Sequence, residues 1–185
     1  MMTELSLNIL DIAQNSVKAE AKLIELAVEI NTASDTLTVL INDDGCGMSA
    51  EQIEKVTDPF FTTRTTRSVG LGVPFFKDAA ESTGGEFGIT SEKGKGTQVK
   101  AVFGLSHIDR VPLGDINATV EMLVFYNTHI DFLYRYKVDD AEFTLDTREI
   151  KDLLEGAPID APDVKVFISE FLRENESEVK KEHIF

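Results

Sequence analysis

Apolar residues recur three or four positions apart from residue 5 to about residue 21, and this spacing predicts a helix. Within it, Asp11, Asn15 and Lys18 fall near one another on one side, because residues three and four apart are neighbours on a helix surface. The first predicted helix therefore presents a group of polar side chains in addition to its apolar stripe.

The remaining pattern alternates between strands and helices. Runs rich in β-branched residues predict strands, Ser49 followed by Gln52 is a capping-box pattern at a helix start, and Gly84-Gly85 ends a helix. In chain order, these signals predict a hairpin at 22–30 and 36–44, helices at 49–56 and 73–83, two strands within 85–105, a helix at 115–128, a hairpin within 130–145, a helix at 147–156 and an amphipathic helix within 158–182.

The pattern changes near His107, where Pro112 and Gly114 interrupt the succession of elements. We therefore expect two units, residues 1–106 and residues 107–185. The second unit is predicted to be a small α+β unit.

Composition and charge narrow the class of protein. With 185 residues, of which 42% are hydrophobic and 28% charged, the chain can form a globular core. Its 18 basic and 33 acidic side chains give a formal net charge of −15, which would repel a phosphate backbone and argues against nucleic acid as a partner. No apolar run reaches the roughly 18 residues of a membrane span, so no membrane partner is expected. The single cysteine, Cys46, points to a reducing compartment, and we expect a cytoplasmic protein.

The strand predicted at 36–44 ends in the run DDGCG, residues 43–47. This places the Asp43 carboxylate at the edge of a sheet, where glycines let a flat ligand or another backbone come close. A carboxylate in that position can accept a hydrogen bond from an exocyclic amine. The same run is also typical of an ordinary turn, and the residues alone leave both interpretations open.

A second glycine-containing run, VGLG at 69–72, precedes a predicted helix and follows a stretch rich in threonine that contains Arg64 and Arg67. Backbone amides at a helix N-terminus with guanidinium groups nearby are typical of a phosphate receptor. The two arginines could equally be a solvated surface pair. The P-loop alternative fails, because no stretch has the spacing GxxxxGK[ST].

The order of these motifs resembles that of the GHKL ATPases, the superfamily of gyrase, heat-shock chaperones, histidine kinases and mismatch-repair ATPases, whose nucleotide site is the Bergerat fold. The resemblance covers about residues 5 to 105. The matching motifs are DIAQNSVKA (11–19), DDGCGM (43–48), DPFFTTR (58–64), VGLG (69–72) and GKGT (94–97). The resemblance implies a two-layer α/β sandwich with a mixed, mainly antiparallel sheet and helices on one face, followed by the small C-terminal α+β unit.

Carried over by position, the resemblance implies that ATP and Mg²⁺ are the ligands. Asn15 would supply its side-chain oxygen to the magnesium ion, Asp43 would bind the adenine amino group with the Thr97 hydroxyl beside it, and Gly47 would leave room for the base. The implied nucleotide site comprises Asn15, Lys18, Asp43, Gly45, Gly47, Met48, Phe60, Arg64, Arg67, Gly70, Leu71, Gly72 and Thr97.

Asp11 is the candidate catalytic base, at the position where hydrolysing members of the family carry a glutamate. The family's phosphoacceptor histidine hairpin has no room before the first motif, and His107, His129 and His183 all follow the ATPase region. We therefore expect a stand-alone member without that hairpin. Two functions remain open: an ATPase or serine protein kinase acting with a regulatory partner protein, or a non-catalytic module that senses ATP. Either would be compatible with a homodimer.

Overall fold

The predicted elements form in the predicted order. The computed structural model describes residues 4–58 and 71–180 of the chain. Its helices and strands are α1 (Leu5–Lys18), β1 (Leu23–Asn31), β2 (Thr36–Asp43), α2 (Ala50–Thr57), α3 (Gly72–Glu81), β3 (Glu86–Glu92), β4 (Gly96–Gly104), α4 (Ile116–Tyr126), β5 (Asp131–Val138), β6 (Ala141–Asp146), α5 (Thr147–Leu153) and α6 (Pro162–Lys180). Within these described ranges, no helix is long and apolar enough to cross a bilayer.

All strands belong to one mixed sheet with the order β3-β4-β2-β1-β5-β6. Neighbouring strands are antiparallel except for β1 and β5, which run parallel from Leu23 opposite Asp131 to Ile30 opposite Val138. The predicted mixed, mainly antiparallel sheet is therefore confirmed.

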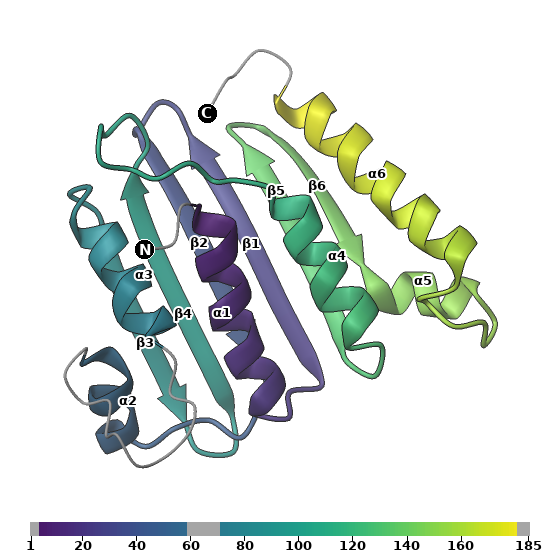
Figure 1. Ribbon diagram of the computed structural model, residues 1–185, viewed down its shortest axis with the longest axis horizontal. Coiled ribbons are helices and arrows are strands. Elements are labelled where there is room, and N and C mark those ends of the chain that lie inside the picture. The colour runs from purple at the N-terminus through teal and green to yellow at the C-terminus, as the bar shows by residue number, and fades with distance from the viewer. Residues whose placement is uncertain (1–3, 59–70, 181–185) are drawn as a thin grey trace.

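The helices cover a single face of this sheet. In β1, Ile24 and Val28 are fully buried, whereas Glu25 and Glu29, which point to the opposite side of a pleated strand, remain partly exposed. Figure 1 shows α1, α3 and α4 lying across that covered face, with α6 along the β6 edge. This arrangement confirms the predicted two-layer α/β sandwich.

The predicted boundary between residues 106 and 107 lies in the connection between β4 and α4. Strands from both sides of this boundary hydrogen-bond into the same sheet through the β1 and β5 pair. The division of the chain into two units stays a prediction. The pairing of β1 with β5 shows that the segment after residue 106 adds strands to the sheet of the segment before it.

Two buried tyrosines of β5, Tyr134 and Tyr136, lie near Glu176 of α6 and should make the stability of the fold depend on pH. The hydroxyls of Tyr134 and Tyr136 are buried and have no hydrogen-bond partner among the described residues. Burial, together with the nearby Glu176 carboxylate, raises the pKa of both phenols above the ordinary value. Since the folded state then keeps protons that the unfolded chain releases above pH 10, the free energy of unfolding should fall as the pH rises past about 10. The expected slope is up to about 1.4 kcal/mol per pH unit for each phenol.

Denaturant titrations between pH 7 and pH 11.5 measure this slope. Replacing Tyr134 by phenylalanine should flatten it and leave stability at pH 7 unchanged or slightly increased, because no hydrogen bond is lost. Tyr126, which is 81% exposed, provides the matched phenylalanine control. A loss of more than about 1 kcal/mol at pH 7 in Tyr134→Phe would show that the hydroxyl has a partner after all.

Candidate functional site

A cavity of about 460 Å³ opens beside the C-terminal half of α1. Asn15 from α1 and Asp43 from the end of β2, which are far apart in sequence, both line it. The nucleotide site implied by the family resemblance requires these two side chains to reach the same ligand, and both of them line this cavity. The polar and small lining residues are Asn15, Ser16, Lys18, Ala19, Asp43, Cys46, Gly47, Gln52, Lys55 and Thr97, and the larger apolar ones are Ile12, Met48, Val56, Val73, Ile89 and Val99.

The Asp43 carboxylate is held in place by two donors. The Ser16 hydroxyl donates to its Oδ2 at 2.6 Å, and the Gly45 backbone N–H donates to its Oδ1 at 2.9 Å. Each carboxylate oxygen can accept more than one hydrogen bond, so acceptor capacity remains for a ligand in the cavity. Ser16 is a site residue that sequence analysis missed. Its position directly after Asn15, on the buried side of α1, was the available signal.

The loop that follows Asp43, residues 43–48, is here called the glycine loop. Its Met48 N–H donates to the Ser91 hydroxyl at 2.8 Å, and that hydroxyl donates to the carbonyl oxygen of Gly96 at 2.8 Å. The Thr97 hydroxyl lies 2.8 Å from Ser91 Oγ, and Thr97 stands opposite Asp43 in the β2 and β4 register. Ser91 thus ties the glycine loop to the β3–β4 hairpin, although no feature of the sequence marked it.

Close backbone approach explains two glycines of this loop. Gly47 has φ +64°, and a Cβ built there would lie 2.0 Å from the carbonyl oxygen of Glu92. A Cβ at Gly45 would lie 2.8 Å from the Cβ of Ala19. Gly47 lines the cavity, whereas Gly45 packs against the end of α1 and is not among the lining residues.

Outside the cavity, α1 approaches the start of α3. Asp11 is half-buried, and a Cβ built at Gly72, the first residue of α3, would lie 3.0 Å from Asp11 Oδ2. Neither Asp11 nor Leu71, which is 42% exposed, is among the residues that line the cavity. The close approach at Gly72 places the N-terminus of α3, which begins with the backbone N–H groups of Gly72 and Val73, next to Asp11. Four predicted site residues fall outside the described ranges, namely Phe60, Arg64, Arg67 and Gly70.

Helix α2 supplies a wall that the sequence analysis did not include. Gln52, Lys55 and Val56 line the cavity, and the predicted capping box between Ser49 and Gln52 is present. On the exposed rim, the hydrogen bond from Lys55 to Glu51 lowers the pKa of the Glu51 carboxyl. Helix α2 begins at Ala50, two residues after the glycine loop, and one of its sides faces the cavity. This short separation was the signal that the sequence offered.

Comparison with known proteins identifies relatives of the first part of the chain. A family model described as histidine kinase-, DNA gyrase B- and HSP90-like ATPase matches residues 2–107. A protein of Shewanella frigidimarina whose name describes a sensor protein is 32% identical over 104 residues, which are 56% of this chain and 16% of that protein. The sensor histidine kinase WalK of Bacillus subtilis is 29% identical over 96 residues, covering 48% of this chain and 16% of WalK. The matched region is thus about one sixth of the length of these relatives.

A solved structure, the N-terminal domain of a DNA repair protein, superposes with a TM-score of 0.57 at 13% sequence identity. The superposition covers 78% of this chain and 53% of that chain. At this identity the likeness concerns the fold, and it agrees with the α/β architecture described above.

Proposed function

Because the chain belongs to the histidine kinase-, DNA gyrase B- and HSP90-like ATPase family, we propose that the cavity beside α1 binds ATP with Mg²⁺. The observation that carries this proposal is that Asn15 and Asp43 line one cavity. Asp43 accepts the adenine amino group, since its carboxylate is oriented by Ser16 and Gly45 and can only accept hydrogen bonds when ionised. Thr97 and Met48 flank the base, and Gly47 leaves space for it.

In this proposal the phosphates extend from the cavity toward Asp11 and the N-terminus of α3. Asn15 offers a side-chain oxygen, the kind of ligand that a hard cation prefers, and no group of three or more acidic, histidine or cysteine side chains in the described part of the chain forms a metal cage. The site therefore fits a magnesium ion that the phosphates help to hold. Bound there, Mg²⁺ would neutralise phosphate charge, while Lys18 and the backbone N–H of Gly72 contact the phosphates.

The proposed activity is ATP hydrolysis or phosphoryl transfer to a regulatory partner protein in the cytoplasm, with Asp11 as the general base. Names of relatives such as WalK motivate the signalling role. A specific observation favours the alternative, a module that senses ATP without turnover: Asp11 does not line the cavity, and its side chain is one methylene shorter than a glutamate. The two functions differ in whether bound ATP is consumed.

Incubation with γ-labelled ATP separates these functions. If the chain is an enzyme, Asp11→Asn should lower turnover about a hundredfold or more while leaving ATP affinity within about twofold, because only the base is removed. Asn15→Ala should remove the part of ATP affinity that depends on Mg²⁺. Gln14→Ala, an exposed neighbour on α1, is the control that should change neither quantity.

Binding of ATP by the wild-type chain without any turnover, alone or with a partner present, would decide for the sensing module. Equal Mg²⁺ dependence in the wild type and in Asn15→Ala would remove Asn15 from the metal site.

A further inference from the structure

The short connector between α1 and β1, residues 19–22, is held on one side by the glycine loop. Asp44 Oδ1 accepts the backbone N–H groups of Lys22 at 2.7 Å and Leu23 at 2.9 Å, and the Cys46 N–H donates to the carbonyl oxygen of Ala19 at 2.9 Å. Glu20, within the connector, has φ +58°, a left-handed conformation that costs a non-glycine residue energy. Hydrogen bonds from the Glu20 N–H to the Val17 carbonyl at 3.1 Å and from the Ala21 N–H to the Ser16 carbonyl at 3.2 Å close the end of α1 in this conformation, and the contacts with the glycine loop add to them.

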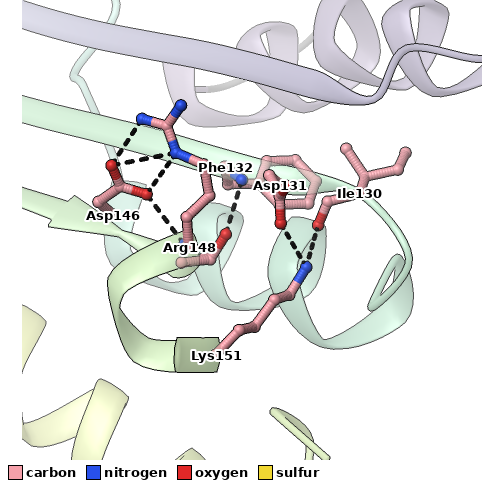
Figure 2. Close-up of polar contacts among 7 residues, drawn as sticks. Ile130, Asp131, Phe132, Asp146, Arg148 and Lys151 are labelled. Carbon is pink, nitrogen blue, oxygen red and sulfur yellow. Dashed lines mark hydrogen bonds and ion pairs between the residues drawn. The ribbon is translucent and has the colours of Figure 1, made fainter. Parts of the chain in front are cut away.

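On its other side the connector is held by the start of β5. The Asp131 N–H donates to the carbonyl oxygen of Lys22 at 2.8 Å. Lys151 of α5 then fixes this strand end, because its Nζ donates to Asp131 Oδ1 at 2.6 Å and to the carbonyl oxygen of Ile130 at 2.9 Å. Figure 2 shows Lys151 reaching from α5 to both oxygens. Lys22 is thus hydrogen-bonded through its N–H to the glycine loop and through its C=O to the C-terminal segment.

Hydrogen bonds at the first turn of α5 fix this helix against the β5–β6 hairpin, and they thereby fix the backbone position of Lys151. The Asp146 side chain caps α5 by accepting the Arg148 N–H at 2.9 Å, and it pairs with the Arg148 guanidinium at 2.6 Å. This pairing lowers the pKa of the Asp146 carboxyl. The Phe132 N–H also donates to the Thr147 hydroxyl at 2.8 Å. Figure 2 shows Arg148 and Asp146 facing each other beside the Lys151 contacts.

We propose that Lys151 and Asp131 are positioning residues for the nucleotide site, acting through Lys22 and Asp44 on the glycine loop that carries Asp43. The inference rests on the proposed binding of ATP. It makes the C-terminal segment a part of that site, although Lys151 and Asp131 lie outside the region of 2–107 that the family model matches. Each step is a hydrogen bond of 2.6 to 2.9 Å between described residues.

The test replaces Lys151 by methionine, which keeps the apolar stem and removes the donors. The ATP dissociation constant, measured by titration calorimetry on the full chain, should rise about threefold or more, within the range of coupling energies between linked sites. Without nucleotide, the amides of Lys22 and Leu23 should exchange hydrogen faster. Lys151→Arg, which restores charged donors, should recover part of both effects.

A matched control lies in the same pair of strands. Arg135 of β5 pairs with Glu29 of β1, toward the other end of these strands. Arg135→Met removes an ion pair between β1 and β5 without touching the connector, so it should leave ATP affinity and amide exchange at Lys22 unchanged.

Equal effects of the two variants, or unchanged ATP affinity in Lys151→Met, would overturn the inference. Faster exchange with unchanged affinity would overturn it as well, since the junction would then be structural only. Failure of the wild-type chain to bind ATP would refute the proposed function first, and is recognised by the absence of heat in the wild-type titration.

Discussion

Replacing Gly47 by alanine should abolish ATP binding and lower the free energy of unfolding by about 2 to 5 kcal/mol. The new Cβ would lie 2.0 Å from the carbonyl oxygen of Glu92 and 2.7 Å from its carbon, on backbone that cannot rotate away as a side chain would. The positive φ of +64° adds a further cost. To relieve the contact, the glycine loop must move away from the β3–β4 hairpin, and both structures form the cavity wall. Denaturant unfolding and titration with ATP measure the two effects.

Gly84 provides the control that separates conformation from contact. It also has positive φ, at +72°, but nothing lies within 4 Å of a Cβ built there. Gly84→Ala should therefore lose only about 1 kcal/mol and retain ATP binding. If Gly47→Ala loses no more stability than Gly84→Ala, the close approach at Glu92 is not the reason for the glycine.

Local patterns were sufficient to predict the elements and one end of the site. The β-branched residues of β1 and β2, the capping box at Ser49 and the glycines after Asp43 act over a few residues, so a single sequence contains their signals. The same holds for the one-turn separation of Asp11 and Asn15 on α1. The resemblance of the motif order to the GHKL ATPases implied that Asn15 and Asp43 belong to one site, and both residues line the same cavity.

Contacts between distant segments could not be predicted in this way. The parallel pairing of β1 with β5 joins residues about a hundred positions apart, and nothing in either strand's composition names its neighbour. Ser91 and Asp44 are unremarkable polar residues until the fold brings a backbone N–H to each of them. The expected boundary after residue 106 followed from a local break in the pattern, and such a break does not reveal that the sheet continues across it.

These distant contacts decide how the site is supported. The Asp43 side chain is oriented by α1 and by its own loop, while the loop is anchored to β3–β4 through Ser91 and to β1 through Asp44. Hydrogen bonds to α1, to the β3–β4 hairpin and to the start of β1 thus hold the acceptor and its loop, an arrangement that favours binding without rearrangement of the site. A substitution that changes only this acceptor should therefore affect recognition more than folding.

Asp43→Asn is that substitution, and it should weaken ATP binding by about 1 to 3 kcal/mol, a factor of roughly 5 to 150 in affinity. An ionised aspartate can only accept hydrogen bonds, which suits the exocyclic amine of adenine, whereas asparagine presents one acceptor and one donor group. The asparagine amide must also satisfy Ser16 and the Gly45 N–H, which donate to the two carboxylate oxygens in the native site. The substitution therefore leaves too few acceptor atoms to bind the adenine amino group as well.

Affinities for ATP and GTP, measured side by side, test this account of base recognition. The wild-type chain should prefer ATP, and the preference should shrink in Asp43→Asn because the new amide donor can face the carbonyl oxygen that guanine carries at the corresponding position. Asp35→Asn is the matched control, since the Asp35 carboxylate accepts from Ser106 in a turn and is not among the residues that line the cavity. An unchanged ATP affinity in Asp43→Asn, or a loss that is equal for the two nucleotides, would mean that Asp43 does not contact the base.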